Sequence, residues 1–277
     1  MTPEELDAYL ARVGYQGERA PRVAVLNALM EAHVAAIPFE NLDVLLEREI
    51  SLAPDAVLDK LVRRRRGGYC FEHNGLFARV LGALDFRVRL LAARARVGRE
   101  RRETPPRTHL CLEVQAEGRP WLVDVGLGGL SLTEAIPFER DTVHATPHEP
   151  RRLLWEGERW WHQAWLGDHW ADVCELTGET MPSIDQEIAS WYASTHPESA
   201  FRREPMVARA LPDGGRLTLR GDVLTLRRGE HVARTQVGSA DALLAVLDER
   251  FGLRLSAGTV LRGCRVPRVA GRPQGLG

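Results

Sequence analysis

One cysteine lies in a sequence context that favours a reactive thiol. Cys70 follows Gly67-Gly68-Tyr69 and opens an apolar run with helical spacing, made of Phe77, Val80, Leu81 and Leu84. The glycines predict a sharp turn into a helix, which places Cys70 in its first turn. There the unpaired N–H groups and the positive end of the helix dipole favour the thiolate, the reactive form of cysteine. The alternative is a buried core cysteine, since unpaired cysteines are among the most buried residues.

A histidine and an aspartate interrupt two apolar segments further along the chain. The segments predict a hairpin around a turn at Glu117 and Gly118. With that register His109 lies opposite Gly126 and diagonal to Asp124, on one face and roughly 7–8 Å away, which the two side chains can bridge. A shift of one residue would separate them. The alternative is a structural His–Asp pair, or two exposed side chains on a solvated face.

Together these three residues have the side chains of a nucleophilic triad. Asp124 would fix the tautomer of the His109 imidazole, and His109 would hold Cys70 as a thiolate. For an oxyanion formed at Cys70, the backbone N–H of Cys70 at the helix end is a candidate donor. The pattern therefore predicts covalent catalysis by cysteine.

Composition narrows the class of protein. The 277 residues carry a net charge of −1, which argues against a nucleic-acid binder. The four cysteines are far apart with no CxxC pair, and His73, His144 and His148 have no metal spacing, so we expect reduced thiols and no metal site. A polar N-terminus and the lack of a long apolar run predict a cytoplasmic protein. Lys60 is the only lysine, which we attribute to coding bias.

Periodicity predicts an α+β protein in three segments. Residues 1–85 are expected to form a helical bundle carrying the nucleophile, beginning with a capping box at Thr2 and Glu5. Residues 86–195 change to a period of two and predict an antiparallel β-barrel carrying His109 and Asp124. Residues 196–277 predict strands and one helix, then a loose tail from about Gly263.

The boundaries of several elements follow from the same patterns. Helices are expected from about Arg22 to Pro38 and near 54–62, and another capped by Ser183 with Gln186. A last helix follows Ser239. Strands are expected at 86–90, 108–114, 121–126, 153–155, 160–166, 170–176, 207–211, 217–219, 223–226 and 232–235.

Five separated segments resemble the motifs of the arylamine N-acetyltransferases in order and spacing. They are Tyr9–Tyr15, Ile37–Leu42, Arg66–Glu72, Thr108–Leu110 and Asp124–Gly126. The resemblance covers most of residues 5 to 210 and is weaker in the last third. It implies a papain-like cysteine-enzyme core with the helical bundle, the β-barrel and an α/β lid.

The resemblance also implies an activity. Cys70 would take an acetyl group from acetyl-CoA and pass it, in a ping-pong mechanism, to the nitrogen of an arylamine, arylhydrazine or N-hydroxyarylamine, as in xenobiotic metabolism. Acetyl-CoA is then the acyl-donor co-substrate, with no metal or prosthetic group, no nucleic acid and no membrane. The protein would be a monomer or a homodimer.

Further positions receive roles by resemblance. Glu40 and Arg66 would form a buried ion pair supporting the nucleophile, the alternative being two unrelated surface charges. Phe39, Val97 and Leu127 are candidate walls of the acceptor pocket, although most apolar residues are simply core. Leu127 departs from the family, which usually has phenylalanine there.

Glycines and arginines near the triad have two interpretations. Gly126, Gly128 and Gly129 would let the backbone approach CoA, but a glycine-rich turn leaving a strand is the commoner explanation. The run Arg63–Arg65 would meet phosphate or form the solvated end of a helix.

Other functions use the same triad. A related acyltransferase or amide synthase, an amidase, a papain-like peptidase or a transglutaminase-like enzyme would transfer or hydrolyse a different acyl group. A non-catalytic relative kept as a binding protein is the alternative from another class, and the intact triad argues against it.

Overall fold

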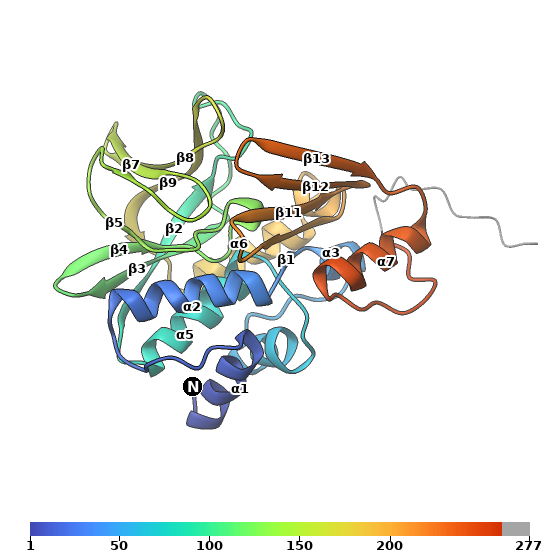
Figure 1. Ribbon diagram of the computed structural model, residues 1–277, viewed down its shortest axis with the longest axis horizontal. Coiled ribbons are helices and arrows are strands. Elements are labelled where there is room, and N and C mark those ends of the chain that lie inside the picture. The colour runs from blue at the N-terminus through green and yellow to red at the C-terminus, as the bar shows by residue number, and fades with distance from the viewer. Residues whose placement is uncertain (262–277) are drawn as a thin grey trace, which may run out of the picture.

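The computed structural model describes residues 1–261, so the tail predicted from Gly263 lies outside the described residues. The β-barrel, a smaller sheet and the N-terminal helices form three neighbouring regions (Figure 1). Within the described residues no helix is both long and apolar enough to cross a membrane. The fold is α+β, as predicted.

Helices occupy most of the first third of the chain. They are α1 (Pro3–Val13), α2 (Val23–Ala36), α3 (Leu42–Leu45), α4 (Pro54–Leu58), the π-helical turn η1 (Asp59–Arg63) and α5 (Cys70–Ala83). The capping box of α1 is confirmed, because Thr2 Oγ1 accepts from the Glu5 N–H at 3.2 Å and Glu5 Oε2 accepts from the Thr2 N–H at 2.9 Å. Gly14 ends α1 with a φ of 73°, which glycine adopts with little strain.

Two further boundaries agree with the sequence. Helix α2 ends at Ala36, because the following Pro38 holds Ile37 in an extended conformation. Helix α5 begins at Cys70, so the cysteine lies in the first turn. The apolar faces of α1, α2 and α5 pack together and against the barrel in one continuous core.

Eight antiparallel strands form a nearly closed barrel in the order β5-β4-β3-β2-β9-β8-β7-β6. They are β2 (Arg87–Ala95), β3 (His109–Ala116), β4 (Arg119–Val123), β5 (Ile136–Pro137), β6 (Val143–His144), β7 (Arg151–Glu156), β8 (Arg159–Trp165) and β9 (Trp170–Thr180). The predicted hairpin register is confirmed by the pair Leu112 and Val123. Glu117 and Gly118 both have positive φ, 51° and 79°, as in the tight turns that suit hairpins.

A second sheet, with order β1-β10-β11-β12-β13, packs on α3 and α7; we call this sheet with α7 the lid. Its elements are β1 (Phe39–Glu40), β10 (Met206–Ala210), β11 (Gly215–Arg220), β12 (Val223–Arg228), β13 (His231–Gln236) and α7 (Ala240–Phe251). Strand β1 comes from the N-terminal segment and pairs with β10, Phe39 opposite Ala208. The N-terminal segment therefore contributes a strand to the lid.

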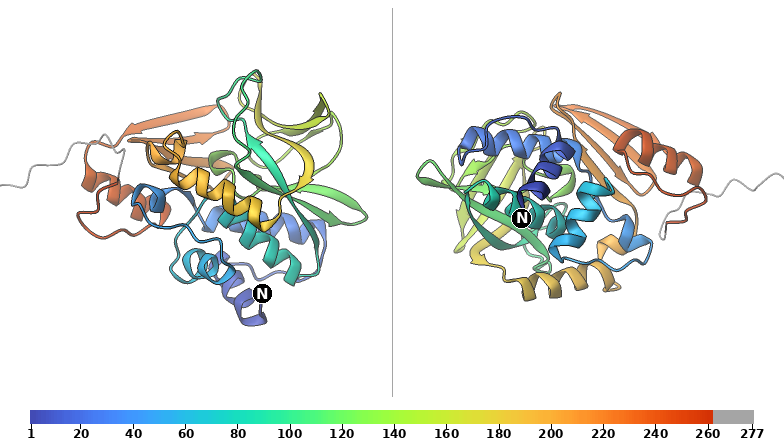
Figure 2. Two further views of the ribbon diagram at one scale, coloured as in Figure 1. Left: turned by 180° about the vertical axis from the view of Figure 1, so that it is seen from behind. Right: turned by 90° about the horizontal axis from the view of Figure 1, so that it is seen from below.

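Helix α6 (Ser183–Thr195) connects the barrel to the lid by way of the short turn η3 (Ala200–Arg202), and it lies beside α5 (Figure 2). The predicted cap of α6 is wrong. Ser183 is already helical, Pro182 occupies the N-cap position without a side-chain hydrogen bond, and Gln186 Nε2 donates to the Met181 carbonyl at 2.7 Å. The Ser-x-x-Gln pattern fails here because the chain enters the helix one residue earlier than a serine cap requires.

Candidate active site

The two glycines before Cys70 are required by close packing. A Cβ atom at Gly67 would lie 1.9 Å from the Pro38 carbonyl oxygen, and one at Gly68 would lie 2.5 Å from Glu72 Oε2. Because the Pro38 oxygen belongs to backbone, it cannot move aside cheaply. The glycines therefore let the segment before α5 pass directly beneath the strand β1.

A buried ionic network supports the first turn of α5. Glu72 Oε2 accepts from the Tyr69 N–H at 3.0 Å, and its Oε1 accepts from Lys60 Nζ at 2.7 Å. Lys60 also contacts Asp43 at 2.9 Å. Arg66 joins Asp43 to Glu40, with Nε 3.0 Å from Glu40 Oε1, so the ion pair predicted by resemblance is formed. Although burial opposes its charge, the carboxylates of Glu72, Glu40 and Asp43 hold the pKa of Lys60 above its usual range.

His109 and Asp124 form a buried hydrogen-bonded pair. His109 Nε2 lies 2.7 Å from Asp124 Oδ2. The other carboxylate oxygen accepts from Asn74 Nδ2 at 2.9 Å and from the Gly126 N–H at 3.1 Å. Every oxygen of this carboxylate is thus engaged, so the imidazole keeps Nε2–H towards Asp124 and leaves Nδ1 free for a neighbour.

The surroundings favour a charged pair. Burial opposes the ionisation of Asp124, but His109, Asn74 and the Gly126 N–H together hold its pKa below the usual range. Burial also disfavours the imidazolium, yet the charge of Asp124, its hydrogen bond and the neighbouring Cys70 raise the pKa of His109 to about 10. His109 is therefore protonated at neutral pH.

Cys70 lies against the His109–Asp124 pair and has little exposure to solvent. Its side chain is buried, 3% exposed, and Sγ is 3.6 Å from the carbonyl oxygen of Thr108, the residue before His109. On the other side, a Cβ at Gly126 would lie 2.8 Å from Cys70 Cα. The structure thus brings Cys70, His109 and Asp124 together from α5, β3 and the end of β4.

Asn74 is a site residue that the sequence analysis did not single out. Its Nδ2 also donates to the Leu110 carbonyl at 2.6 Å, and its Oδ1 accepts from the Val125 N–H at 3.1 Å. The available signal was spacing, because residues four apart share a helix face and Asn74 is four residues after Cys70.

Besides Cys70, the buried thiol of Cys174 also lies close to the His109–Asp124 pair. Ligand atoms of Cys174, His109 and Asp124 lie within 4.8 Å of one another. Such a set could contribute to a metal site only if the 2.7 Å hydrogen bond between His109 and Asp124 were broken. The donor geometry therefore suits a hydrogen-bonded pair better than a metal ion.

The three residues predicted to line the acceptor pocket lie in β1, just beyond β2 and in the turn after β4. The Phe39 ring stacks on His73, with centroids 6.3 Å apart, and contacts Phe201 at 6.0 Å. Phe201 was missed because it lies in a segment distant in sequence with no motif. Leu127 is half-buried in the turn after β4, and Val97, just beyond β2, is 52% exposed.

Close packing explains the glycines in the turn after Asp124 without any contact to a ligand. Gly126 approaches the Cys70 backbone, and a Cβ at Gly129 would lie 2.8 Å from the Thr218 methyl group. Gly128 has a φ of 63° and faces the Phe39 ring. The commoner interpretation of these glycines, close packing in a turn, has direct support.

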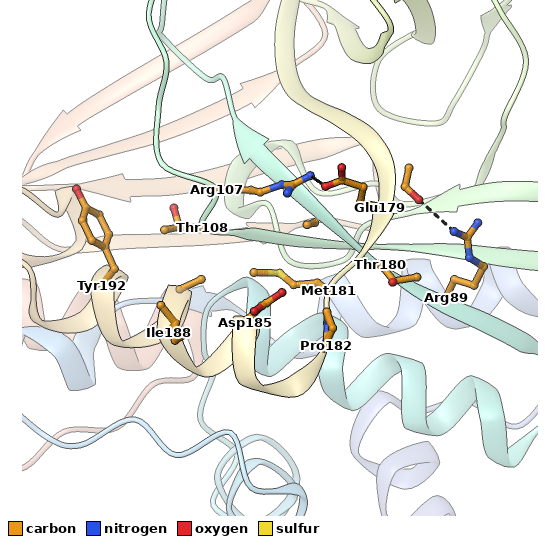
Figure 3. A pocket seen from close by; sticks show the side chains of 13 residues that line it. Arg89, Arg107, Thr108, Glu179, Thr180, Met181, Pro182, Asp185, Ile188 and Tyr192 are labelled. Atoms are coloured by element: carbon orange, nitrogen blue, oxygen red, sulfur yellow. Dashed lines mark hydrogen bonds and ion pairs between the residues drawn. The ribbon is translucent and has the colours of Figure 1, made fainter.

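An open groove of about 840 Å³ runs between β2, β9 and α6 beside the site (Figure 3). Thr108 lines it, together with Met181 and Tyr192, and an Arg107–Glu179 ion pair crosses it. Since the Thr108 carbonyl contacts Cys70 Sγ, the groove reaches the edge of the candidate catalytic residues.

His73, whose sequence position has no metal spacing, is part of a buried chain of hydrogen bonds. Its Nε2 donates to the Pro38 carbonyl at 3.2 Å, its Nδ1 lies 2.8 Å from His33 Nε2, and His33 Nδ1 lies 2.8 Å from Tyr9 Oη. Burial lowers the pKa of His73 to about 4. The ring is therefore neutral and ties α1, α2 and α5 together.

Comparison with known proteins agrees with this geometry. The family model described as N-acetyltransferase matches residues 22–260. The arylamine N-acetyltransferase of Mycobacterium tuberculosis is 42% identical over 257 residues, covering 91% of this chain and 90% of the relative. The Escherichia coli arylamine N-acetyltransferase is also 42% identical, over 259 residues, with the same coverage.

Solved structures agree as well. The Mycobacterium marinum arylamine N-acetyltransferase in complex with CoA superposes with a TM-score of 0.86 at 41% identity, covering 89% of this chain and 92% of that one. The Salmonella typhimurium enzyme gives 0.87 at 38% identity, covering 94% and 96%. The fold and the family match define a transferase. The chain belongs to the arylamine N-acetyltransferase family.

Proposed function

We propose that this chain transfers an acetyl group from acetyl-CoA to the nitrogen of an arylamine, arylhydrazine or N-hydroxyarylamine through an acetyl-Cys70 intermediate. The observation that carries the proposal is the His109–Asp124 pair beside a cysteine at the first turn of α5. The M. marinum structure with CoA supports acetyl-CoA as the donor.

In the first half-reaction Cys70 is the nucleophile. In the proposed step Cys70 reacts in its thiolate form beside His109, and the positive end of α5 favours this negative charge. Sγ attacks the thioester carbonyl, an S–C bond forms, and the oxyanion accepts from the N–H of Cys70. Collapse expels CoA as a thiolate, which takes the proton from His109.

In the second half-reaction the amine nitrogen attacks the acetyl-cysteine. His109, now neutral, accepts the proton that the nitrogen loses, and Cys70 leaves as the thiolate. Asp124 keeps the same imidazole nitrogen facing the reaction throughout, because Asn74 and the Gly126 N–H fix its carboxylate. The enzyme returns to its starting charge state.

Intact-mass measurement tests this mechanism. We expect acetyl-CoA alone to add one acetyl group to the protein but not to Cys70→Ala, and we expect aniline to remove it. If the folded protein gains no acetyl group, the acetyl-donor proposal fails, and other acyl-CoAs are to be tried. If acetyl-CoA is hydrolysed without an amine as fast as with one, an amidase-like activity replaces the transferase.

The state of the cysteines fits the predicted compartment. Cys70, Cys111 and Cys174 are free and buried, as expected of a protein in the reducing cytoplasm. Light scattering on the purified protein distinguishes the monomer from the homodimer.

A further inference from the structure

One buried carboxylate far from the triad in sequence binds three arginines. Glu149 is 3% exposed, and its carboxylate contacts Arg151 from β7, Arg216 from β11 and Arg227 from β12. Arg216 is bidentate, with Nη2 2.5 Å from Oε1 and Nε 3.3 Å from Oε2, and Arg227 Nη2 is 2.8 Å from Oε2. The cluster joins the barrel to the lid.

Two of the three arginines also bind a backbone turn. Arg151 Nη2 donates to the Leu130 carbonyl at 2.9 Å, and Arg216 Nη1 donates to the Ser131 carbonyl at 2.8 Å. These carbonyls end the single turn of 3-10 helix η2 (Gly128–Leu130). A carbonyl end carries partial negative charge, which complements a guanidinium.

That turn forms part of the active site. The segment 125–131, which contains this turn, follows Asp124 directly, and the Leu132 N–H donates back to the Asp124 carbonyl at 2.7 Å. Through Gly126 it touches the backbone of Cys70, and through Gly128 it touches the ring of Phe39. The position of the turn therefore sets the space between the nucleophile and Phe39.

The charges in this cluster indicate that the arginines do more than neutralise Glu149. One carboxylate faces three guanidinium groups, and unbalanced buried charge is costly. Burial, which Glu149 only partly offsets, together with the charges of Arg151 and Arg227, lowers the pKa of Arg216 to about 10. The two carbonyls, together with His162 Nε2 at 3.2 Å from Arg151 Nη1, are polar groups that face this excess.

We propose that Arg216 is a positioning residue for acetyl transfer. Glu149 holds its guanidinium, which in turn fixes the Ser131 carbonyl. The carbonyl belongs to the turn 126–131 that borders the acceptor site, so Arg216 fixes this turn. This inference rests on the proposed function for its effect on the reaction. It goes beyond that function by assigning a role in acceptor binding to a residue of the lid.

Arg216→Lys tests the inference, with Arg227→Lys as the matched control. A lysine can keep the charge beside Glu149, but one ammonium cannot bridge Glu149 and Ser131 as the planar guanidinium does. Arg227 meets the same carboxylate and touches neither turn carbonyl in the contacts described for it. Hydrogen exchange of residues 124–132 reports on the turn, and steady-state kinetics with acetyl-CoA and aniline reports on the acceptor.

We expect Arg216→Lys to speed exchange in the turn and to lower kcat/KM for aniline about 10- to 100-fold, mainly through KM, and Arg227→Lys to do neither. The pH dependence of Cys70 alkylation should not change, because Asp124 is held independently by Asn74. Equal exchange and kinetics in the two variants would overturn the inference. If the wild-type protein transfers no acetyl group, the proposed function is refuted instead. Hydrogen exchange would still decide whether Arg216 holds the turn. If Arg216→Lys does not fold, Arg216→Gln replaces it with the same expected outcome.

Discussion

Gly126 lies so close to Cys70, the proposed nucleophile, that no side chain fits between them. A Cβ at this position would be 2.8 Å from Cys70 Cα and 2.7 Å from Asn74 Nδ2. The contact joins the end of β4 to the first turn of α5, so it sets the distance between the two halves of the triad.

Gly126→Ala should separate these two halves. We expect a stability loss of about 1–3 kcal/mol from overpacking and a fall of about 100-fold in the rate of acetyl-enzyme formation. Chemical denaturation and time-resolved intact mass measure the two effects. Gly75→Ala is the control, because it lies in α5 with nothing within 4 Å of the added Cβ. Equal activity in both variants would contradict the interpretation.

Removal of the buried lysine should be costly. Lys60→Met leaves Glu72 and Asp43 without the ammonium that lies 2.7 and 2.9 Å from them, so we expect about 3–5 kcal/mol of destabilisation. Urea unfolding followed by circular dichroism measures this. As a comparison, Arg254→Met removes an exposed pair with Asp248 and should cost less than about 1 kcal/mol. A similar small loss for Lys60→Met would show that the network does not support α5.

The His109–Asp124 pair predicts a dependence of stability on alkaline pH. The folded pKa of His109, about 10, lies above the unfolded value. The contribution of the raised His109 pKa is therefore complete below about pH 6.5 and is lost as pH rises towards about 10. We expect the free energy of unfolding of the wild type to fall relative to His109→Gln across this interval. Parallel curves for the two proteins would rule out a charged His109.

Substitutions of Leu127 test whether this residue lines the acceptor pocket. Leu127→Phe introduces the aromatic side chain usual in the family, and one aromatic contact is worth about 0.5–1.5 kcal/mol. KM for aniline should fall by about 2- to 10-fold, corresponding to that energy, with acetyl-enzyme formation unchanged. Leu127→Met, which keeps a similar volume without a ring, should behave like the wild type. If Leu127→Phe leaves KM unchanged, the residue does not line the acceptor site.

Local patterns predicted the parts of the fold that depend on neighbouring residues. The capping box at Thr2, the start of α5 at Cys70 and the hairpin register around Gly118 are all set within a few residues. The predicted hairpin register was enough by itself to place His109 close to Asp124. The cap expected at Ser183 was wrong, because Pro182 already fixes where that helix begins.

Contacts between distant segments could not be predicted in this way. The contact of Phe201 with Phe39 depends on how η3 packs on β1. The Glu149 cluster likewise depends on β7, β11 and β12 meeting, and no pattern near Glu149 indicates its partners. Such positions follow from the packing of whole elements rather than from local sequence.

The burial of Lys60 also affects how the protein reacts with its own donor. It is the only lysine in the chain, it is 7% exposed, and carboxylates keep it protonated. The chain thus carries acetyl-CoA chemistry without an accessible ε-amine that could be acetylated by accident. A second acetyl group on the intact protein would therefore point to a group other than a lysine side chain.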